Sequence, residues 1–288
     1  MKPASFSYEA PATLAAALAA LATRRDEAKI IAGGQSLVPM MNMRLARPSH
    51  LVDIGGLAEL SEVRREADHL VVGALVRHAD LALNPLVCEH APMLAHAAGT
   101  IGHYAIRQRG TLGGSLAHAD PAAQLPLCAV ALDATVEIAS VRGNRPVAAP
   151  DFFVSVFTTG LEPDELLVAL RLPLPSPRTG WGFRLFTRRA GDFALGSVAA
   201  TLVRNGDGSL GRLNLAVGGI SATPIRLEAV APSGLIDDRD PEWSARAAHV
   251  VAKAAPVEET ERVPAIFRRE LLAALVRDVL DDAAGRAS

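Results

Sequence analysis

Short apolar stretches alternate with amphipathic ones along the first 172 residues, a pattern that predicts short strands and helices in turn. The predicted helices cover residues 11–23, 37–45, 85–98 and 121–132, and the predicted strands cover 29–32, 50–54, 70–73, 134–139 and 166–172. The sequence RGNRP, residues 142–146, predicts a turn. We therefore expect two α/β subdomains, at about residues 1–55 and 56–175.

The pattern changes after a stretch rich in proline, residues 173–180, which predicts a linker. Strands are predicted at 181–187, 197–204 and 210–220, with a hairpin signal at 205–208, and two helices are predicted at 241–254 and 264–284. Strands followed by helices are typical of an α+β domain. The sequence as a whole predicts an α+β fold of two domains, residues 1–175 and 176–288.

Composition narrows the class of protein. Half of the 288 residues are hydrophobic and the net charge is −2 with both signs interspersed, so no basic face suggests nucleic-acid binding. No apolar run of 18 residues and no signal-peptide h-region is present, so we expect a cytoplasmic protein without a membrane span. The two cysteines, Cys88 and Cys128, cannot supply a four-cysteine iron–sulfur or zinc site. Both lie in apolar stretches and are expected in the core.

Two glycine pairs with matching neighbours are the main candidate for chemistry. Residues 32–36 read Ala-Gly-Gly-Gln-Ser and residues 111–115 read Thr-Leu-Gly-Gly-Ser. No P-loop and no GxGxxG motif is present. Consecutive glycines let backbone N–H groups converge on an anion, and two such loops facing each other suit a diphosphate. The alternative is that each pair is only a tight turn.

Two longer stretches carry a resemblance to a known family. AGGQSLVPMMNMRLARPSHLVDI and IRQRGTLGGSLAHADPAAQLP, with ELLVALRLP and FRLFTRRAGDFA, resemble the FAD-binding medium subunit of the xanthine dehydrogenase / carbon monoxide dehydrogenase family of molybdenum hydroxylases. The resemblance covers nearly the whole chain. It implies an FAD-binding fold of the vanillyl-alcohol-oxidase / p-cresol-methylhydroxylase type with a C-terminal α+β domain.

The resemblance also implies which residues lie at the FAD. The flavin is the redox group, so no side chain is expected to be catalytic. Gln124 stands where relatives often have Asp or Glu, and Gln35 stands where they often have His, so a non-covalent FAD is expected. Phe193 matches the residue that covers the flavin ring, with an ordinary core Phe as the alternative. The implied cofactor-binding residues are Ala32, Gly33, Gly34, Gln35, Ser36, Leu37, Ile101, Thr111, Leu112, Gly113, Gly114, Ser115, His118, Gln124, Leu167, Arg184 and Phe193.

The implied partners are a small subunit with [2Fe–2S] clusters and a large molybdopterin subunit, in a dimer of heterotrimers. Electrons would pass from the clusters to FAD and on to an external acceptor, while the large subunit oxidises the substrate, with a lean toward an N-heterocycle or purine-like compound. The alternatives are a carbon monoxide dehydrogenase medium subunit, a stand-alone FAD oxidoreductase and a nucleotide-binding regulatory module. Sequence leaves the acceptor open between NAD, quinone, oxygen and a cytochrome.

Two further groups are assigned structural roles. His118 and Asp120 supply at most two ligands, so we expect a part of the flavin loop and no metal site. Met40, Met41 and Met43 lie at helical spacing and are expected to pack in the core.

Overall fold

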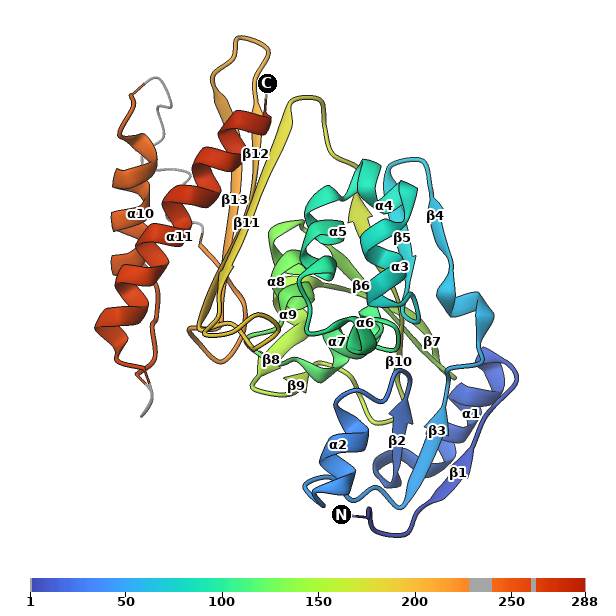
Figure 1. The fold of residues 1–288 in the computed structure, drawn as a ribbon. Coiled ribbons are helices and arrows are strands. Elements are labelled where there is room, and N and C mark those ends of the chain that lie inside the picture. The colour runs from blue at the N-terminus through green and yellow to red at the C-terminus, as the bar shows by residue number, and fades with distance from the viewer. Residues whose placement is uncertain (1, 228–239, 260–262, 288) are drawn as a thin grey trace.

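The computed structural model describes residues 2–227, 240–259 and 263–287. Its three larger sheets follow one another along the chain, and each is covered by its own helices (Figure 1). We call the regions around these sheets the first, second and third parts of the chain.

The first part holds a parallel sheet in the strand order β1-β3-β2. Its elements are β1 (Ser7–Glu9), α1 (Leu14–Arg24), a 3-10 turn (Arg25–Glu27), β2 (Ala28–Ile31), α2 (Leu37–Asn42) and β3 (His50–Asp53). The hydroxyl of Thr13 accepts a hydrogen bond from the N–H of Ala16 and starts α1, whose Ala17 and Leu21 pack in one cluster with Val52. The chain leaves β2 straight into the first glycine pair.

The second part holds an antiparallel sheet in the order β4-β5-β10-β6-β7, so its strands and helices alternate without making parallel β–α–β units. Its strands are β4 (Val63–Arg65), β5 (His69–Gly73), β6 (Thr135–Ser140), β7 (Gly143–Ala148) and β10 (Leu166–Pro173), with a 3-10 turn at Ala58–Ser61 and a small hairpin of β8 (Phe153–Ser155) and β9 (Thr158–Thr159). Its helices are α3 (His78–Leu83), α4 (Pro85–His90), α5 (Pro92–Gly99), α6 (Tyr104–Arg107), α7 (Leu112–His118), α8 (Gln124–Ala131) and α9 (Ala149–Phe152).

The third part holds an antiparallel sheet between two layers of helices (Figure 1). Its elements are β11 (Thr179–Phe186), β12 (Gly196–Arg204), β13 (Leu210–Gly218), β14 (Ile225–Arg226), α10 (Trp243–Ala254) and α11 (Ala265–Arg286). Alternate residues of β12 face opposite layers, since Val198 packs with α10 and α11 whereas Ala199 packs with the second part. A Cβ on Gly182 would lie 2.1 Å from the Val279 carbonyl oxygen, so glycine lets α11 lie directly on β11.

Most of the predicted elements are present, and the differences have local causes. The predicted helix 85–98 is two helices, because the chain leaves helical geometry at Ala91, just before Pro92. The predicted helix 121–132 begins only at Gln124. The predicted turn at 142–146 is mostly strand β7, paired with β6 in a tight hairpin. The predicted linker already enters β11 at Thr179.

The cysteine and methionine predictions are only partly right. Cys128 is fully buried in α8, as expected, but Cys88 is exposed on α4, so its assignment to the core is wrong. Of the three methionines, Met41 is buried whereas Met43 is 52% exposed, because α2 ends at Asn42 and Met43 lies beyond it.

Candidate functional site

The first glycine loop, residues 32–37, connects β2 to α2 through a sharp change of direction. Gly34 has a φ of +71°, a conformation that side chains with a Cβ disfavour. The Gly34 carbonyl accepts from the N–H of Val38 at 3.1 Å, and the Gln35 amide donates to the Gly33 carbonyl at 3.1 Å. Ser36 stands at the N-cap position of α2, but its hydroxyl makes no capping bond there.

Backbone donors accumulate in this loop. Within the described chain, no hydrogen-bond acceptor is found for the N–H groups of residues 33–37. Five consecutive free donors are unusual, because the great majority of backbone N–H groups in folded proteins are paired with protein or water. The loop therefore has the donor set that a phosphate group requires.

The second glycine loop, residues 109–115, touches the first. A Cβ on Gly33 would lie 2.1 Å from the carbonyl oxygen of Arg109, so the two loops are in backbone contact. The guanidinium of Arg77 donates to that same carbonyl. The two glycine loops, which are 77 positions apart when counted from Gly33 to Gly110, therefore lie side by side.

The second loop nonetheless differs from the predicted anion nest, because its glycines lie in the first turn of α7. Thr111 caps the helix, and its hydroxyl accepts from the N–H of Gly114 at 3.1 Å. The N–H of Leu112 donates to Val76 and that of Gly113 to Ala74, at 3.0 and 2.8 Å. A Cβ on Gly113 would lie 2.6 Å from the Cβ of Ala74. These glycines serve close packing, and their N–H groups are already bonded.

A buried histidine supports the second loop from behind. His78 is 6% exposed, its backbone N–H donates to the Gly110 carbonyl, and its Nε2 lies 2.9 Å from the Thr111 carbonyl oxygen. Burial, with a smaller contribution from the nearby Arg107 and Arg77, lowers the pKa of His78 to about 4. The ring is therefore neutral at pH 7 and donates through Nε2–H to Thr111. The local sequence carries no signal for this link, because Thr111 lies 33 positions from His78.

The other predicted residues of the second part lie around α7 and α8. Leu167 is buried in β10. The carbonyl of the next residue, Val168, accepts from the N–H of Ala74. Gln124 is buried at the start of α8. The Ile101 carbonyl accepts from the Arg107 guanidinium at 2.9 Å. His118 ends α7, and its ring stacks on Phe157 at 4.9 Å between centroids.

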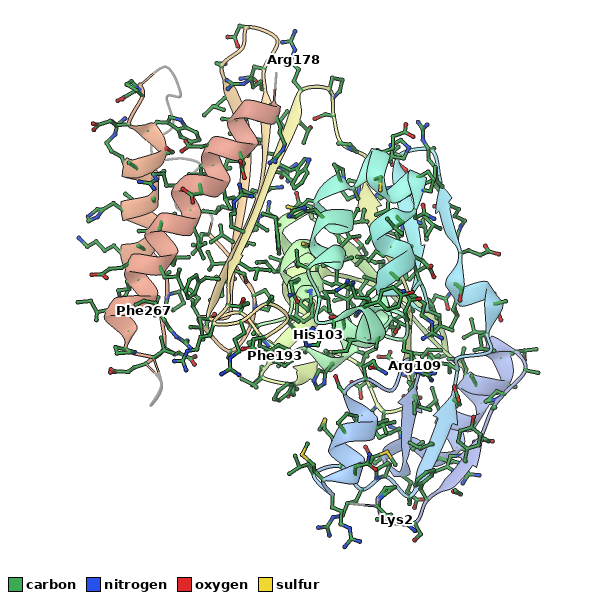
Figure 2. All side chains as sticks on the ribbon, in the orientation of Figure 1. Lys2, His103, Arg109, Arg178, Phe193 and Phe267 are labelled. Carbon is green, nitrogen blue, oxygen red and sulfur yellow. The ribbon has the colours of Figure 1, made fainter. Side chains whose placement is uncertain are left out.

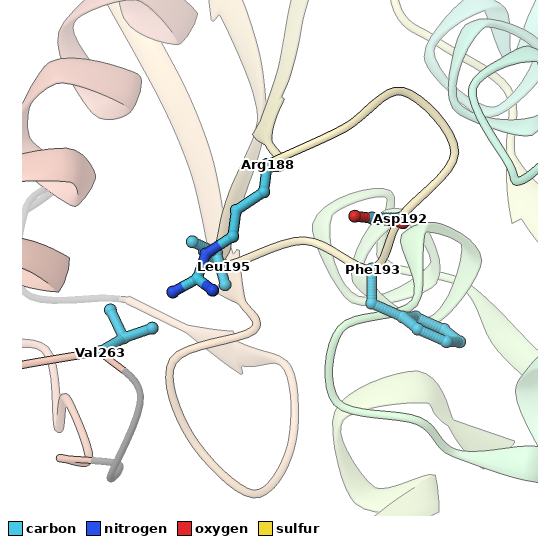
Figure 3. A pocket seen from close by; sticks show the side chains of 5 residues that line it. All are labelled: Arg188, Asp192, Phe193, Leu195 and Val263. Carbon is cyan, nitrogen blue, oxygen red and sulfur yellow. The ribbon is translucent and has the colours of Figure 1, made fainter.

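Two of the predicted cofactor-binding residues, Arg184 and Phe193, come from the third part of the chain, and their surroundings differ from each other. The Arg184 guanidinium forms an ion pair with Asp282 of α11 at 2.5 Å, and no hydrogen bond ties it to the glycine loops in the described chain. Phe193 is 68% exposed, so the alternative of a core Phe is wrong. It lines a cavity of about 230 Å³ together with Arg188, Asp192, Leu195 and Val263. Figure 3 shows its ring pointing away from Arg188 and Val263, toward the second part.

Potential metal ligands do not cluster in the described residues. No group of three or more His, Cys, Asp or Glu that could hold a metal ion is found within residues 2–227, 240–259 and 263–287. The carboxylate of Asp120 accepts from the N–H of Ala122 in a local turn. No helix in these ranges is both long and apolar enough to cross a bilayer.

Comparison with known proteins identifies the family. The family model for the FAD-binding domain in molybdopterin dehydrogenase matches residues 4–175, and that for the carbon monoxide dehydrogenase flavoprotein C-terminal domain matches residues 181–283. The chain is an FAD-binding medium subunit of the molybdenum hydroxylase family. The resemblance seen in the sequence is thereby confirmed, and FAD is its cofactor.

This medium subunit has full-length relatives of known activity. It is 39% identical to the 6-hydroxypseudooxynicotine dehydrogenase complex subunit alpha of Paenarthrobacter nicotinovorans, over 100% of this chain and 97% of the relative. A crystal structure of quinoline 2-oxidoreductase from Pseudomonas putida 86 matches with a TM-score of 0.94 and 36% identity, covering 100% and 99% of the two chains. Carbon monoxide dehydrogenase from Hydrogenophaga pseudoflava matches with a TM-score of 0.94 and 32% identity, covering 100% of both. The predicted α+β FAD-binding fold is confirmed, and the medium subunit belongs to an oxidoreductase.

Proposed function

We propose that this chain is the electron-transfer subunit of a molybdenum hydroxylase and holds its FAD non-covalently across the two glycine loops. FAD held there would supply the redox chemistry by which electrons pass from the [2Fe–2S] clusters of a small partner to an external acceptor. A large molybdopterin partner oxidises the substrate, and we expect a dimer of heterotrimers. The observation that carries the proposal is the run of five free N–H donors at residues 33–37.

The residues present fit FAD in different ways. The N–H groups of the first loop and the hydroxyl of Ser36 bind the diphosphate, because both are donors without a protein partner in the described chain. The second loop holds the first in place through the Gly33–Arg109 contact. Gln35 offers an amide, bonded to the backbone, and therefore no group for a covalent flavin link. Phe193 covers the flavin ring from the third part, which its exposure toward the second part supports.

The domain division and the location complete the proposal. We keep an FAD-binding domain over 1–175, with subdomains meeting near residue 55, and a C-terminal domain over 176–288. The separate hydrophobic cluster in which β12 and β13 pack on α10 and α11 supports the boundary near residue 175. We also propose a cytoplasmic location for the chain.

The substrate of the complex is chosen on the large partner, and we propose an N-heterocyclic or purine-like compound. Relatives named for 6-hydroxypseudooxynicotine and quinoline support this class. The match to carbon monoxide dehydrogenase keeps a carbon monoxide-oxidising complex as the second candidate.

Purification of the tagged chain from its own host tests the function. The expected preparation is yellow, contains one FAD per chain, and includes a small cluster-bearing chain and a large molybdopterin chain. Acid precipitation should leave the flavin in the supernatant, because no covalent bond holds it. A colourless chain would overturn the cofactor assignment, and full turnover by the chain alone would establish the stand-alone oxidoreductase instead. Turnover with quinoline and with carbon monoxide then separates the two substrate classes.

A further inference from the structure

The turn that carries Phe193 is attached firmly at its base. We define the Phe193 turn as residues 187–195, between β11 and β12. At its base the N–H of Leu195 donates to the Phe186 carbonyl at 2.8 Å, and Ala194 is buried. At its tip the N–H of Asp192 donates to the Arg189 carbonyl at 3.1 Å. The base fixes where the turn begins and ends, whereas the position of the tip depends on what the tip contacts.

The tip rests on a residue of the second part. Gly191 has a φ of +88°, and a Cβ placed on it would lie 2.6 Å from Cε1 and 2.9 Å from Nδ1 of His103. The imidazole therefore packs directly on the Gly191 backbone, two residues before Phe193. Figure 2 shows His103 and Phe193 in the same region, between the second and third parts.

His103 is itself held in position by the segment that leads to the second glycine loop. It stands at the N-cap of α6, where its carbonyl accepts from Ile106 and Arg107 at 3.0 and 3.2 Å. The guanidinium of Arg107 folds back onto the carbonyl of Gly102 at 3.2 Å. The Ile106 carbonyl then accepts from the N–H of Gly110 at 2.8 Å, at the start of the second loop.

From this continuous set of contacts we infer that His103 is a positioning residue, which places the Phe193 turn relative to the FAD site. The inference rests on the proposed function for its consequence: the contact sets how far Phe193 covers the flavin ring, and so how freely oxygen and the acceptor reach it. The side chain of His103 is exposed, and within the described chain its ring forms no hydrogen bond.

Substitutions on both sides of the contact test the inference in the full chain with FAD bound. Gly191→Ala and His103→Ala should each change the flavin absorbance band and raise the rate at which oxygen reoxidises the reduced flavin, because a displaced Phe193 turn covers the flavin ring less completely. The effects of the two substitutions should not add in the double variant, because both act on the same contact and His103→Ala removes the ring with which an alanine side chain at position 191 would collide. His103→Phe, which keeps a flat ring, should behave like the wild type.

Gly208→Ala is the matched control, because Gly208 has a similar φ of +84° but nothing within 4 Å of a Cβ. It carries the backbone strain of Gly191→Ala without the collision. If Gly191→Ala and His103→Ala both leave the spectrum and the oxygen rate at the level of Gly208→Ala, the positioning role is wrong. A wild-type chain that binds no FAD would instead overturn the proposed function.

A second measurement does not need flavin. The turn contains Arg188 and Arg189, so trypsin can cleave within it. In the flavin-free chain, Gly191→Ala and His103→Ala should raise the initial cleavage rate at these arginines by about tenfold, since the open population governs proteolysis. Equal cleavage in the wild type and both variants would show that His103 does not hold the turn.

Discussion

Both glycine loops contain a Gly-Gly pair followed within two residues by a serine, and they use it for different physical purposes. In the first loop Gly34 adopts a positive φ, and the N–H groups of residues 33–37 have no acceptor in the described chain. In the second loop neither glycine has a positive φ, and the N–H groups of Leu112, Gly113 and Gly114 are bonded to Val76, Ala74 and Thr111. One loop is built to donate to a ligand, and the other is built to support it.

The difference shows that a glycine pair does not by itself specify an anion nest. Gly113 and Gly33 are both required because another backbone or side chain approaches too closely for a Cβ. Only the first loop combines that close approach with free donors. Substitutions in the two loops should therefore separate loss of flavin from loss of stability.

Gly33→Val should have the largest effect, because its side chain would overlap the Arg109 backbone, which cannot rotate away as a side chain can. We expect FAD affinity to fall at least about 100-fold, equivalent to about 3 kcal/mol, with unfolding free energy reduced by about 1–3 kcal/mol. Flavin fluorescence titration and urea denaturation measure the two quantities. Gly56→Val is the control, since nothing lies within 4 Å of a Cβ there. Normal flavin binding by Gly33→Val would show that FAD binding does not depend on the contact between the two loops.

The support of the second loop by His78 should make stability depend on pH. Burial lowers the folded-state pKa of His78 to about 4, below its usual value of 6.5, so the unfolded chain binds the extra proton between these values. Stability should be unaffected by this group above pH 6.5 and should fall by about 3 kcal/mol as the pH decreases to 4. Urea denaturation between pH 4 and 8 measures the slope. In His78→Gln the unfolding free energy should depend less steeply on pH, by the contribution of about one proton. An unchanged pH dependence would contradict the role of His78.

A crossed pair of substitutions with smaller effects gives the sharpest comparison of the loops. Thr111→Ala removes the cap of α7 and should cost about 1 kcal/mol of stability, with FAD affinity nearly unchanged. Ser36→Ala breaks no capping bond and should leave stability within about 0.5 kcal/mol, but should weaken FAD binding by about tenfold through the lost hydroxyl donor. Thr111→Ser keeps the cap and serves as control. If Thr111→Ala lost flavin and Ser36→Ala did not, the roles of the loops would be reversed.

The smallest effect on stability is expected for Phe193→Ala. Because Phe193 is 68% exposed, its removal should change unfolding free energy by less than about 0.5 kcal/mol, far below the cost of truncating a core Phe. The flavin absorbance band should still shift, because the ring that covers it is gone. An unchanged flavin absorbance band at full FAD occupancy would show that Phe193 does not cover the flavin ring.

Sequence patterns predicted the third part well, because β12, β13 and α11 are long and regular. They failed where structure depends on distant partners. α6 and α7 have only 4 and 7 residues and were not predicted, and the first N–H groups of α7 bond to Val76 and Ala74, far upstream in the chain. Strand β7 was taken for a turn because Gly143, Asn144 and Pro146 are turn residues.

The same reason limited the prediction of the site. The glycine pairs marked two loops that lie in contact in the structure, because the residue types alone imply close approach or free donors. Whether a glycine pair provides close approach or free donors depends on distant residues. In the second loop the carbonyls of Ala74 and Val76, more than thirty residues upstream, accept from the backbone N–H groups. His103 likewise had no local signal for its contact with Gly191, which is 88 positions further along.

The unequal burial of the two cysteines makes the chain ready for site-specific labelling without mutagenesis. Cys88 is exposed, whereas Cys128 is fully buried and burial raises the pKa of its thiol, so a maleimide dye should attach at one position. Because FAD absorbs visible light, it can accept energy from a dye attached at Cys88. The fluorescence of the dye would therefore increase when the chain loses FAD. Each variant proposed above could then be followed in real time, with the native thiol as the only handle.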